Sequence, residues 1–122
     1  SPQTSVAAGA VPACTKRFVV RDEHRLHLIG VDHIDWFESM GNYVRVHSGG
    51  REYLMRTTMD TVARRLAGNA DFVRVRRSAI VNLRAVAALE RYAKSAYLIR
   101  LRDGAKIISS RYYLPAIRDV LS

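Results

Sequence analysis

Runs in which hydrophobic and polar residues alternate dominate this chain, and this pattern predicts β-strands with one buried face. Polar or glycine-containing turns separate successive runs, which favours antiparallel hairpins. The clearest turn signals are residues 21–24, 41–42, 49–50 and 103–104. The sequence therefore predicts a mainly β fold of short antiparallel strands and hairpins. The predicted strands cover residues 18–20, 26–29, 31–38, 43–47, 52–56, 72–76, 86–92, 97–102 and 106–108.

Two segments have the helical period of about 3.6 residues instead. In the mid-chain helix we expect Thr57 to cap the N-terminus and Gly68 to lie just past the C-terminus. The second helix is short and ends the chain. It should begin near Tyr113, because Pro115 is tolerated only in a first helical turn. The apolar positions that define the two helices are Met59, Val62, Ala63 and Leu66, then Leu114, Ile117 and Leu121.

The densest positive charge lies in residues 72–82. Strand parity places Arg74 and Arg76 on one face and Val73 and Val75 on the other. If the valines are core, Arg74 faces solvent in mid-strand and is suited to contact a phosphate. The alternative interpretation is an edge strand that arginines keep soluble.

The same stretch continues into a turn and a short apolar run. Arg77 has the parity of the valines, and an unpaired guanidinium in the core would cost much free energy. We therefore expect the strand to end there and to release Arg77 into a turn with Ser78. Asn82 follows an apolar triplet, a position that favours capping of loop backbone over contact with a ligand.

Net charge changes the picture of function more than any other property of the composition. The chain has 122 residues, a net charge of +9 and an isoelectric point near 10.4, which is typical of proteins that bind polyphosphates. Acidic membrane surfaces would also suit this charge. However, 17 of the 20 cationic residues are arginine, whose planar donors favour hydrogen-bonded recognition of phosphates or guanine edges.

Three ordered motifs resemble the LytTR family, the β-rich DNA-binding output domain of many bacterial response regulators. The first is Ile-Asp-Trp-Phe-Glu-Ser-Met-Gly-Asn-Tyr-Val at residues 34–44. The second is Phe-x-Arg-Val-x-Arg-Ser-x-x-Val-Asn at residues 72–82, and the third joins Leu-Arg-Asp-Gly at 101–104 to Ser-Ser-Arg at 109–111. The resemblance implies an elongated fold whose loops, and not a recognition helix, enter the major groove of double-stranded DNA.

The resemblance also implies which residues face the DNA. They are Asn42 or Tyr43, then Arg76, Arg77 and Ser78, then Ser109 and Arg111, and strand parity adds Arg74. An arginine on a turn can bind guanine O6 and N7, so we expect base recognition from Arg77 and phosphate contact from Arg74. The family further implies a transcription regulator, a missing N-terminal regulatory domain and paired or repeated DNA sites. A dimer is then expected only in the full-length protein or on DNA.

The first 15 residues are rich in Ser, Ala, Gly and Pro and carry no charge, so we expect a linker or disordered tail before a domain at residues 16–122. No signal peptide or transmembrane pattern is found there. Cys14 is the only cysteine, which excludes an intrachain disulfide and favours the cytoplasm.

Catalytic and cofactor motifs are not recognisable in the sequence. The spacing of the four histidines does not suggest a metal site, and no serine lies in a glycine-flanked nucleophile elbow. We therefore expect a protein that is not an enzyme and has no cofactor, metal or small-molecule substrate. Two other functions remain open: a small basic RNA-binding module, and a protein-interaction domain that docks an acidic partner.

Overall fold

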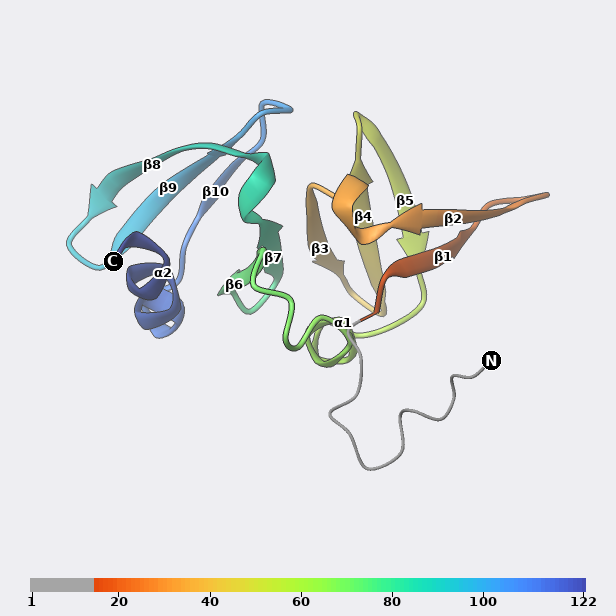
Figure 1. The fold of residues 1–122 in the computed structure, drawn as a ribbon, viewed down its shortest axis with the longest axis horizontal. Helices are drawn as coiled ribbons and strands as arrows, with labels where there is room; N and C mark the ends of the chain where they lie inside the picture. The colour runs from red at the N-terminus through yellow and green to blue at the C-terminus, as the bar shows by residue number, and fades with distance from the viewer. Residues whose placement is uncertain (1–14) are drawn as a thin grey trace.

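The computed structural model describes residues 15–122, and in this range the chain forms ten strands and two α-helices (Figure 1). The predicted tail at residues 1–15 lies almost wholly outside the described residues. The strands are β1 (Arg17–Arg21), β2 (Leu26–Gly30), β3 (Trp36–Met40), β4 (Tyr43–Ser48), β5 (Arg51–Met55), β6 (Phe72–Arg76), β7 (Ala79–Asn82), β8 (Val86–Ala93), β9 (Ala96–Leu101) and β10 (Lys106–Ile108). The α-helices are α1 (Met59–Arg65) and α2 (Leu114–Leu121), and short 3₁₀ helices occupy Val31–His33, Leu83–Ala85 and Arg111–Tyr113.

The strands form three antiparallel sheets that follow one another along an elongated molecule (Figure 1). A five-stranded sheet of order β5-β4-β3-β7-β6 lies in the middle. The β1–β2 hairpin lies on one side of it, and the three-stranded sheet β10-β9-β8 lies on the other with α2. The prediction of an elongated, mainly β fold with one mid-chain helix and one C-terminal helix is therefore confirmed.

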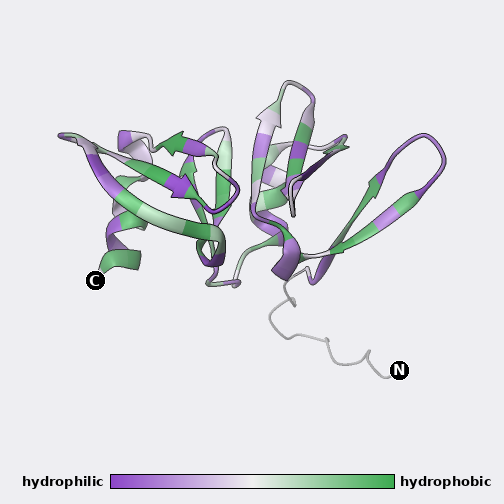
Figure 2. Ribbon diagram, turned by 90° about the horizontal axis from the view of Figure 1, so that it is seen from above, coloured by the Kyte–Doolittle hydropathy of each residue, from purple (hydrophilic) through white to green (hydrophobic). Residues whose placement is uncertain are grey.

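The five-stranded sheet separates two hydrophobic clusters. Neighbouring residues of a strand point to opposite faces, so Phe37 of β3 joins one cluster and Trp36 joins the other. β7 repeats this division with Ile80 and Val81, and all four of its residues are buried. Because both faces are covered, residues 79–81 of β7 form an apolar run, in place of the alternation of hydrophilic and hydrophobic residues that Figure 2 shows along other parts of the chain.

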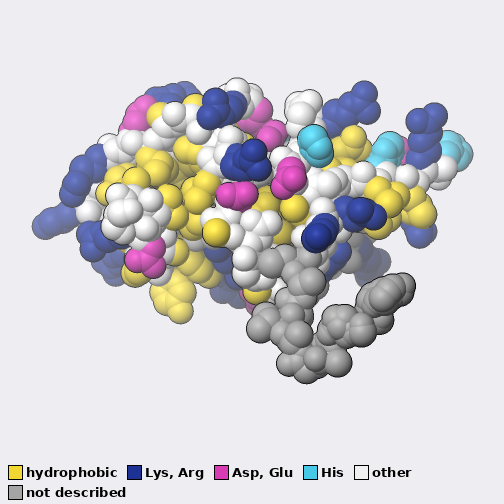
Figure 3. Space-filling view, viewed as in Figure 1, with side chains coloured by type: hydrophobic (Ala, Val, Ile, Leu, Met, Phe, Trp, Pro, Cys, Tyr) yellow, Lys and Arg dark blue, Asp and Glu magenta, His cyan; other side chains and the backbone are white. Residues whose placement is uncertain are grey.

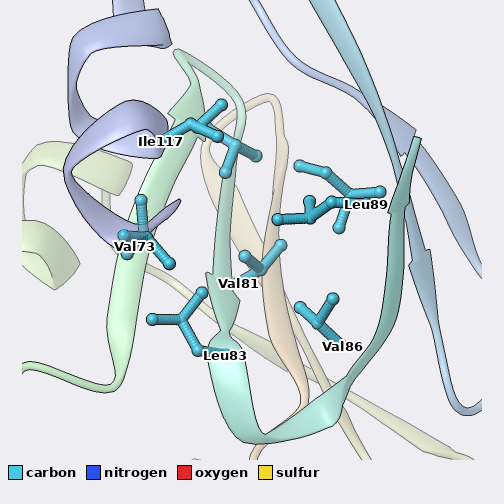
Figure 4. Close-up of a pocket in the computed structure, with 9 residues that line it drawn as sticks. Val73, Val81, Leu83, Val86, Leu89 and Ile117 are labelled. Carbon is cyan, nitrogen blue, oxygen red and sulfur yellow. The ribbon is translucent and has the colours of Figure 1, made fainter. Parts of the chain in front are cut away.

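The second cluster joins the five-stranded sheet to the C-terminal part of the molecule. Figure 4 shows side chains from β6, β7, β8 and α2 pointing toward one another. The space left between them is about 10 Å³, roughly the minimum that a single water molecule needs. The two sides are therefore packed against each other, and α2 has a fixed position relative to β6. The labelled residues are Val73, Val81, Leu83, Val86, Leu89 and Ile117.

Several predicted boundaries differ from the structure, most of them by one residue, and β7 was not predicted as a strand. The strand expected at residues 31–38 is the 3₁₀ helix Val31–His33 followed by β3, because Val31 and Ile34 are both buried without strand pairing. The cap of α1 is Thr58 and not Thr57, since the Thr58 hydroxyl accepts a hydrogen bond from the Thr61 N–H at 3.1 Å. The start of α2 was predicted to within one residue.

Asn82 has the capping role that its position predicted. Its side chain is almost fully buried, donates to the Ile34 carbonyl at 2.8 Å and accepts from the Arg84 N–H at 2.9 Å. The asparagine thus links the end of β7 to the segment that leads into β3.

None of the helices in residues 15–122 is both long and apolar enough to cross a membrane.

Candidate nucleic-acid interface

Two turns meet at one end of the five-stranded sheet. The β3–β4 hairpin turns at Gly41, whose φ of 65° suits glycine, and at Asn42. The β6–β7 hairpin turns at Arg77 and Ser78. β3 pairs with β7 in antiparallel register, and the Ser39 N–H donates to the Ser78 carbonyl at 2.9 Å. The first two sequence motifs therefore present their turns side by side.

The third motif reaches the same end of the sheet from β10. The Ser110 N–H donates to the carbonyl of Val75 in β6 at 2.8 Å, which places residues 109–111 beside the β6–β7 turn. In Figure 1 the β3–β4 turn, the β6–β7 turn and the segment before α2 lie along the lower edge of the molecule. We call these three segments the turn surface: residues 41–43, 76–78 and 109–111.

Arg77 and Ser78 are the members of the turn surface with the most freedom to meet a ligand. The Arg77 side chain is exposed and makes no hydrogen bond or ion pair with any residue in the described range. Ser78 is half-buried, and only its backbone carbonyl is used. Arg76 is also exposed, although its Nη1 lies 3.4 Å from the Ile108 carbonyl. The expectation that Arg77 leaves the strand for the turn is confirmed.

Arg74 differs from its prediction. Its side chain is only 19% exposed, and its Nη1 lies 2.9 Å from the carboxylate of Asp60 in α1. Its Nη2 donates to the Arg77 carbonyl at 2.7 Å, and its guanidinium lies 5.6 Å from the centre of the Tyr113 ring. The prediction that Arg74 faces solvent is therefore wrong. The error arises because Asp60 of α1 and Tyr113, which are both distant from Arg74 in sequence, cover its side chain.

The Asp60–Arg74 pair also affects the acid. The hydrogen bond and the charge of Arg74 lower the pKa of Asp60 below its ordinary value, with smaller contributions from Arg77 and Arg64.

A register shift between Arg74 and Arg76 adds a β-bulge at Val75. Bulges change the direction of side chains, and this one separates the partly buried Arg74 from the exposed Arg76.

The third motif combines a structural serine with a free arginine. Ser109 is 5% exposed, and its hydroxyl accepts from the Tyr97 N–H at 2.9 Å, so the expectation that its side chain faces DNA is wrong. The Ser110 hydroxyl accepts from the Tyr112 N–H and caps the 3₁₀ helix. Arg111 is exposed, and its side chain has no polar partner among residues 15–122. Arg111 thus forms no ion pair with a described residue, and the nearby acid Glu90 pairs with Arg100.

In the first motif, Asn42 is exposed and Tyr43 is 40% exposed. Neither side chain has a polar partner within the described residues. A short amide beside a phenol can donate and accept hydrogen bonds at base edges or phosphates. The turn surface thus combines an amide, a phenol, a serine and three exposed arginines: Asn42, Tyr43, Ser78, Arg76, Arg77 and Arg111.

Comparison with known proteins agrees with this geometry. The sequence profile of the LytTr DNA-binding domain matches residues 24–122. The chain belongs to this family. It is a DNA-binding domain, and the profile covers all three segments of the turn surface.

Two relatives extend the comparison of this LytTr domain. The sensory transduction protein LytT of Bacillus subtilis (strain 168) is 29% identical over 79 residues, which make up 65% of this chain and 32% of LytT. The chain therefore spans about a third of the length of that relative. A solved LytTr DNA-binding domain from a Bacillus cereus protein superposes with a TM-score of 0.80 at 17% identity. This match covers 88% of this chain and 98% of the other, and it shows a shared fold.

Sequence reasoning overlooked two exposed arginines next to the LytTr turn surface. Arg56 follows β5 at the end where Met55 pairs with Val44, and Arg21 ends β1. Neither belongs to a motif; the register of β4 with β5 brings Arg56 close to Tyr43, and the packing of β1 beside β5 brings Arg21 to the same hollow. Figure 3 shows Lys and Arg side chains over both halves of one face of the molecule, so charge alone could not have singled out these two arginines.

Within residues 15–122, no group of His, Cys, Asp and Glu side chains could hold a metal ion.

Proposed function

We propose that this LytTr domain binds double-stranded DNA sequence-specifically by inserting side chains of the turn surface into the major groove. One observation carries the proposal: three segments distant in sequence meet at one sheet end, where the side chains of Arg77 and Arg111 have no hydrogen-bond or ion-pair partner within the described residues. A guanidinium on a turn can donate two hydrogen bonds to guanine O6 and N7, a pattern unique to that base in the major groove.

The two arginines are also presented differently from the cations that lie within strands. Turns project their side chains beyond the sheet, whereas an arginine in mid-strand lies against neighbouring strands. α1 has only seven residues, and the arginines of its last turn are engaged within the domain: Arg64 donates to Thr61, and Arg65 lies over the Phe18 ring. Recognition through turns therefore agrees with the geometry better than recognition through a helix.

In the cell, we propose that the domain is the output module of a bacterial response regulator. This rests on the B. subtilis relative, which is called a sensory transduction protein and is about three times as long as the matched region. We further propose paired DNA sites. Two linked domains would bind the second site intramolecularly, which raises the overall affinity without new contacts.

Selection from random duplexes, followed by binding isotherms over a salt series, tests the proposal. Arg77→Ala should lower affinity for the selected duplex by about 1–3 kcal/mol and relax its specificity. Arg84→Ala is the matched control, because Arg84 is exposed and lies beyond the opposite end of β7. The selected sequences also show whether a single or a repeated site is bound.

Three results would contradict the proposal. Equal loss of affinity for selected and scrambled duplexes in Arg77→Ala would exclude base recognition by this residue. Failure of the selection to enrich any duplex sequence would exclude specific binding. Tighter binding to single-stranded RNA than to duplex DNA would favour the RNA-binding alternative.

A further inference from the structure

A basic hollow adjoins the turn surface on the side of the β1–β2 hairpin. It has a volume of about 690 Å³, and three arginines and one carboxylate line it: Arg21, Arg56, Arg65 and Asp22. Tyr43 lies at its border and also belongs to the turn surface, so the two regions are continuous. We call this hollow the flanking groove.

The charges of the flanking groove are not balanced within the protein. Arg21 and Arg56 are exposed, and their side chains make no hydrogen bond or ion pair within residues 15–122. Arg65 is partly engaged, because its guanidinium lies 4.1 Å from the centre of the Phe18 ring and its Nε donates to Thr15. Two guanidinium groups are therefore free to bind an anion.

The single carboxylate of the groove already has partners. Asp22 accepts hydrogen bonds from the backbone N–H groups of His24 at 3.1 Å and Arg25 at 2.9 Å, and it lies 2.7 Å from His27 Nε2. These bonds, chiefly that of His27, lower the pKa of Asp22. Asp22 thus shapes its own turn and does not neutralise the two arginines.

Apolar side chains complete the wall of the groove. Val19 is 51% exposed, Leu54 is 50% exposed, and Tyr43 presents its ring beside them. A nucleic-acid backbone alternates anionic phosphates with sugar rings that have apolar faces. This mixture of free guanidinium groups and apolar surface fits a sugar–phosphate backbone better than it fits an isolated small anion.

We propose that the flanking groove binds the backbone of duplex DNA beyond the base pairs that the turn surface contacts, with Arg56 and Arg21 bound to phosphates. This inference rests on the proposed function, because the duplex must first engage the turns. It predicts a longer DNA footprint than the three sequence motifs define. Phosphate contacts of this kind position the protein without adding sequence preference.

Arg56 and Arg51 provide a matched pair for the test. Both are exposed arginines of one strand region, and they lie at opposite ends of β5, about 16 Å apart at roughly 3.3 Å per residue. This separation exceeds the Debye length of about 8 Å at physiological salt. Arg56→Ala and Arg51→Ala therefore remove the same charge, but only the first removes a contact of the groove.

The experiment measures affinity of the whole chain for the selected and scrambled duplexes over a salt series. Arg56→Ala should weaken binding to both duplexes by the same factor and reduce the slope of log K against log salt by about one unit. Arg51→Ala should leave the slope unchanged. Shortening the duplex on the flanking side should bring wild type and Arg56→Ala to equal affinity, and Arg56→Lys should retain most of the binding.

Three results would overturn the inference. The slopes of Arg56→Ala and Arg51→Ala could be equal, or the loss in Arg56→Ala could persist on the shortened duplex. A fall in melting temperature of Arg56→Ala would indicate a structural role instead. These outcomes differ from failure of the proposed function, in which the wild-type chain itself does not prefer the selected duplex over the scrambled one.

Discussion

Asn82→Ala should destabilise the domain strongly and leave its contacts with DNA intact. The side chain is 2% exposed and forms two hydrogen bonds, to the Ile34 carbonyl and from the Arg84 N–H. Each such bond contributes about 1 kcal/mol net, and a buried carbonyl left without a donor costs about 1–3 kcal/mol. Ile34 is fully buried, so we expect a loss of about 3 kcal/mol. This corresponds to a fall in melting temperature of roughly 12 °C.

The assay combines thermal unfolding with DNA binding at a temperature well below the transition. Asn82 lies at the opposite end of β7 from the turn at Arg77 and Ser78, so the folded fraction of the variant should bind DNA with unchanged affinity. If Asn82 instead contacted DNA, affinity would fall while the melting temperature stayed the same. That result, or a fall of less than about 4 °C, would refute the reasoning.

Asn82→Asp separates the two hydrogen bonds. An aspartate can still accept from the Arg84 N–H, but its carboxylate cannot donate to the Ile34 carbonyl. Burial should raise the pKa of the introduced carboxyl group, which is destabilising above that pKa and becomes less so as the pH falls. The melting temperature of this variant relative to wild type should therefore recover as the pH is lowered toward 5.

Two further substitutions test Arg74 and Arg111, which the sequence analysis expected to contact DNA. Arg74→Ala should lower the melting temperature by at least about 5 °C, because it removes the bonds to Asp60 and to the Arg77 carbonyl, and thermal unfolding checks this. The lowered pKa of Asp60 makes the effect of this substitution depend on pH. The stabilisation from ionised Asp60 is complete above the ordinary carboxyl pKa of about 3.9 and is lost as the pH falls through the lower pKa of the folded state. The melting temperatures of wild type and Arg74→Ala should therefore become equal in strong acid. Arg111→Ala should weaken DNA binding without changing the melting temperature, and parallel losses of both would contradict the free side chain seen here.

Local pattern was sufficient to predict most of the fold. The hairpin turns, the mid-chain helix and the cap at Asn82 each depend on residues within a few positions of one another, and all are present in the structure. The start of β3 was misplaced because Val31 and Ile34 continue an apolar pattern although a 3₁₀ helix presents them to the core. Periodicity alone does not distinguish these two ways of burying a side chain.

The candidate site could be predicted only as far as its residues depend on their own strand. Arg77 was placed correctly because the parity of β6 and the cost of burying a guanidinium both concern neighbouring positions. Arg74 and Ser109 were misplaced because their partners, Asp60 and Tyr97, lie 14 and 12 residues away in sequence. Arg56 carries no motif, and only the register of β4 with β5 brings it near the turn surface.

The burial of β7 on both faces explains why Asn82 matters to a surface four residues away. Alternation normally fixes the register of a strand, because a slip by one residue would expose its apolar side chains. In β7, Ile80 and Val81 both face hydrophobic clusters, so a slip would exchange one apolar contact for another. Such a slip would move the turn at Ser78 relative to the β3–β4 turn by about 3.3 Å, close to the rise of about 3.4 Å per base pair in DNA. The hydrogen bonds of Asn82 favour the native register, together with the backbone pairing of β3 with β7 and the bond from Ser39 to Ser78, and this pairing keeps the spacing of the two turns when Asn82 is replaced.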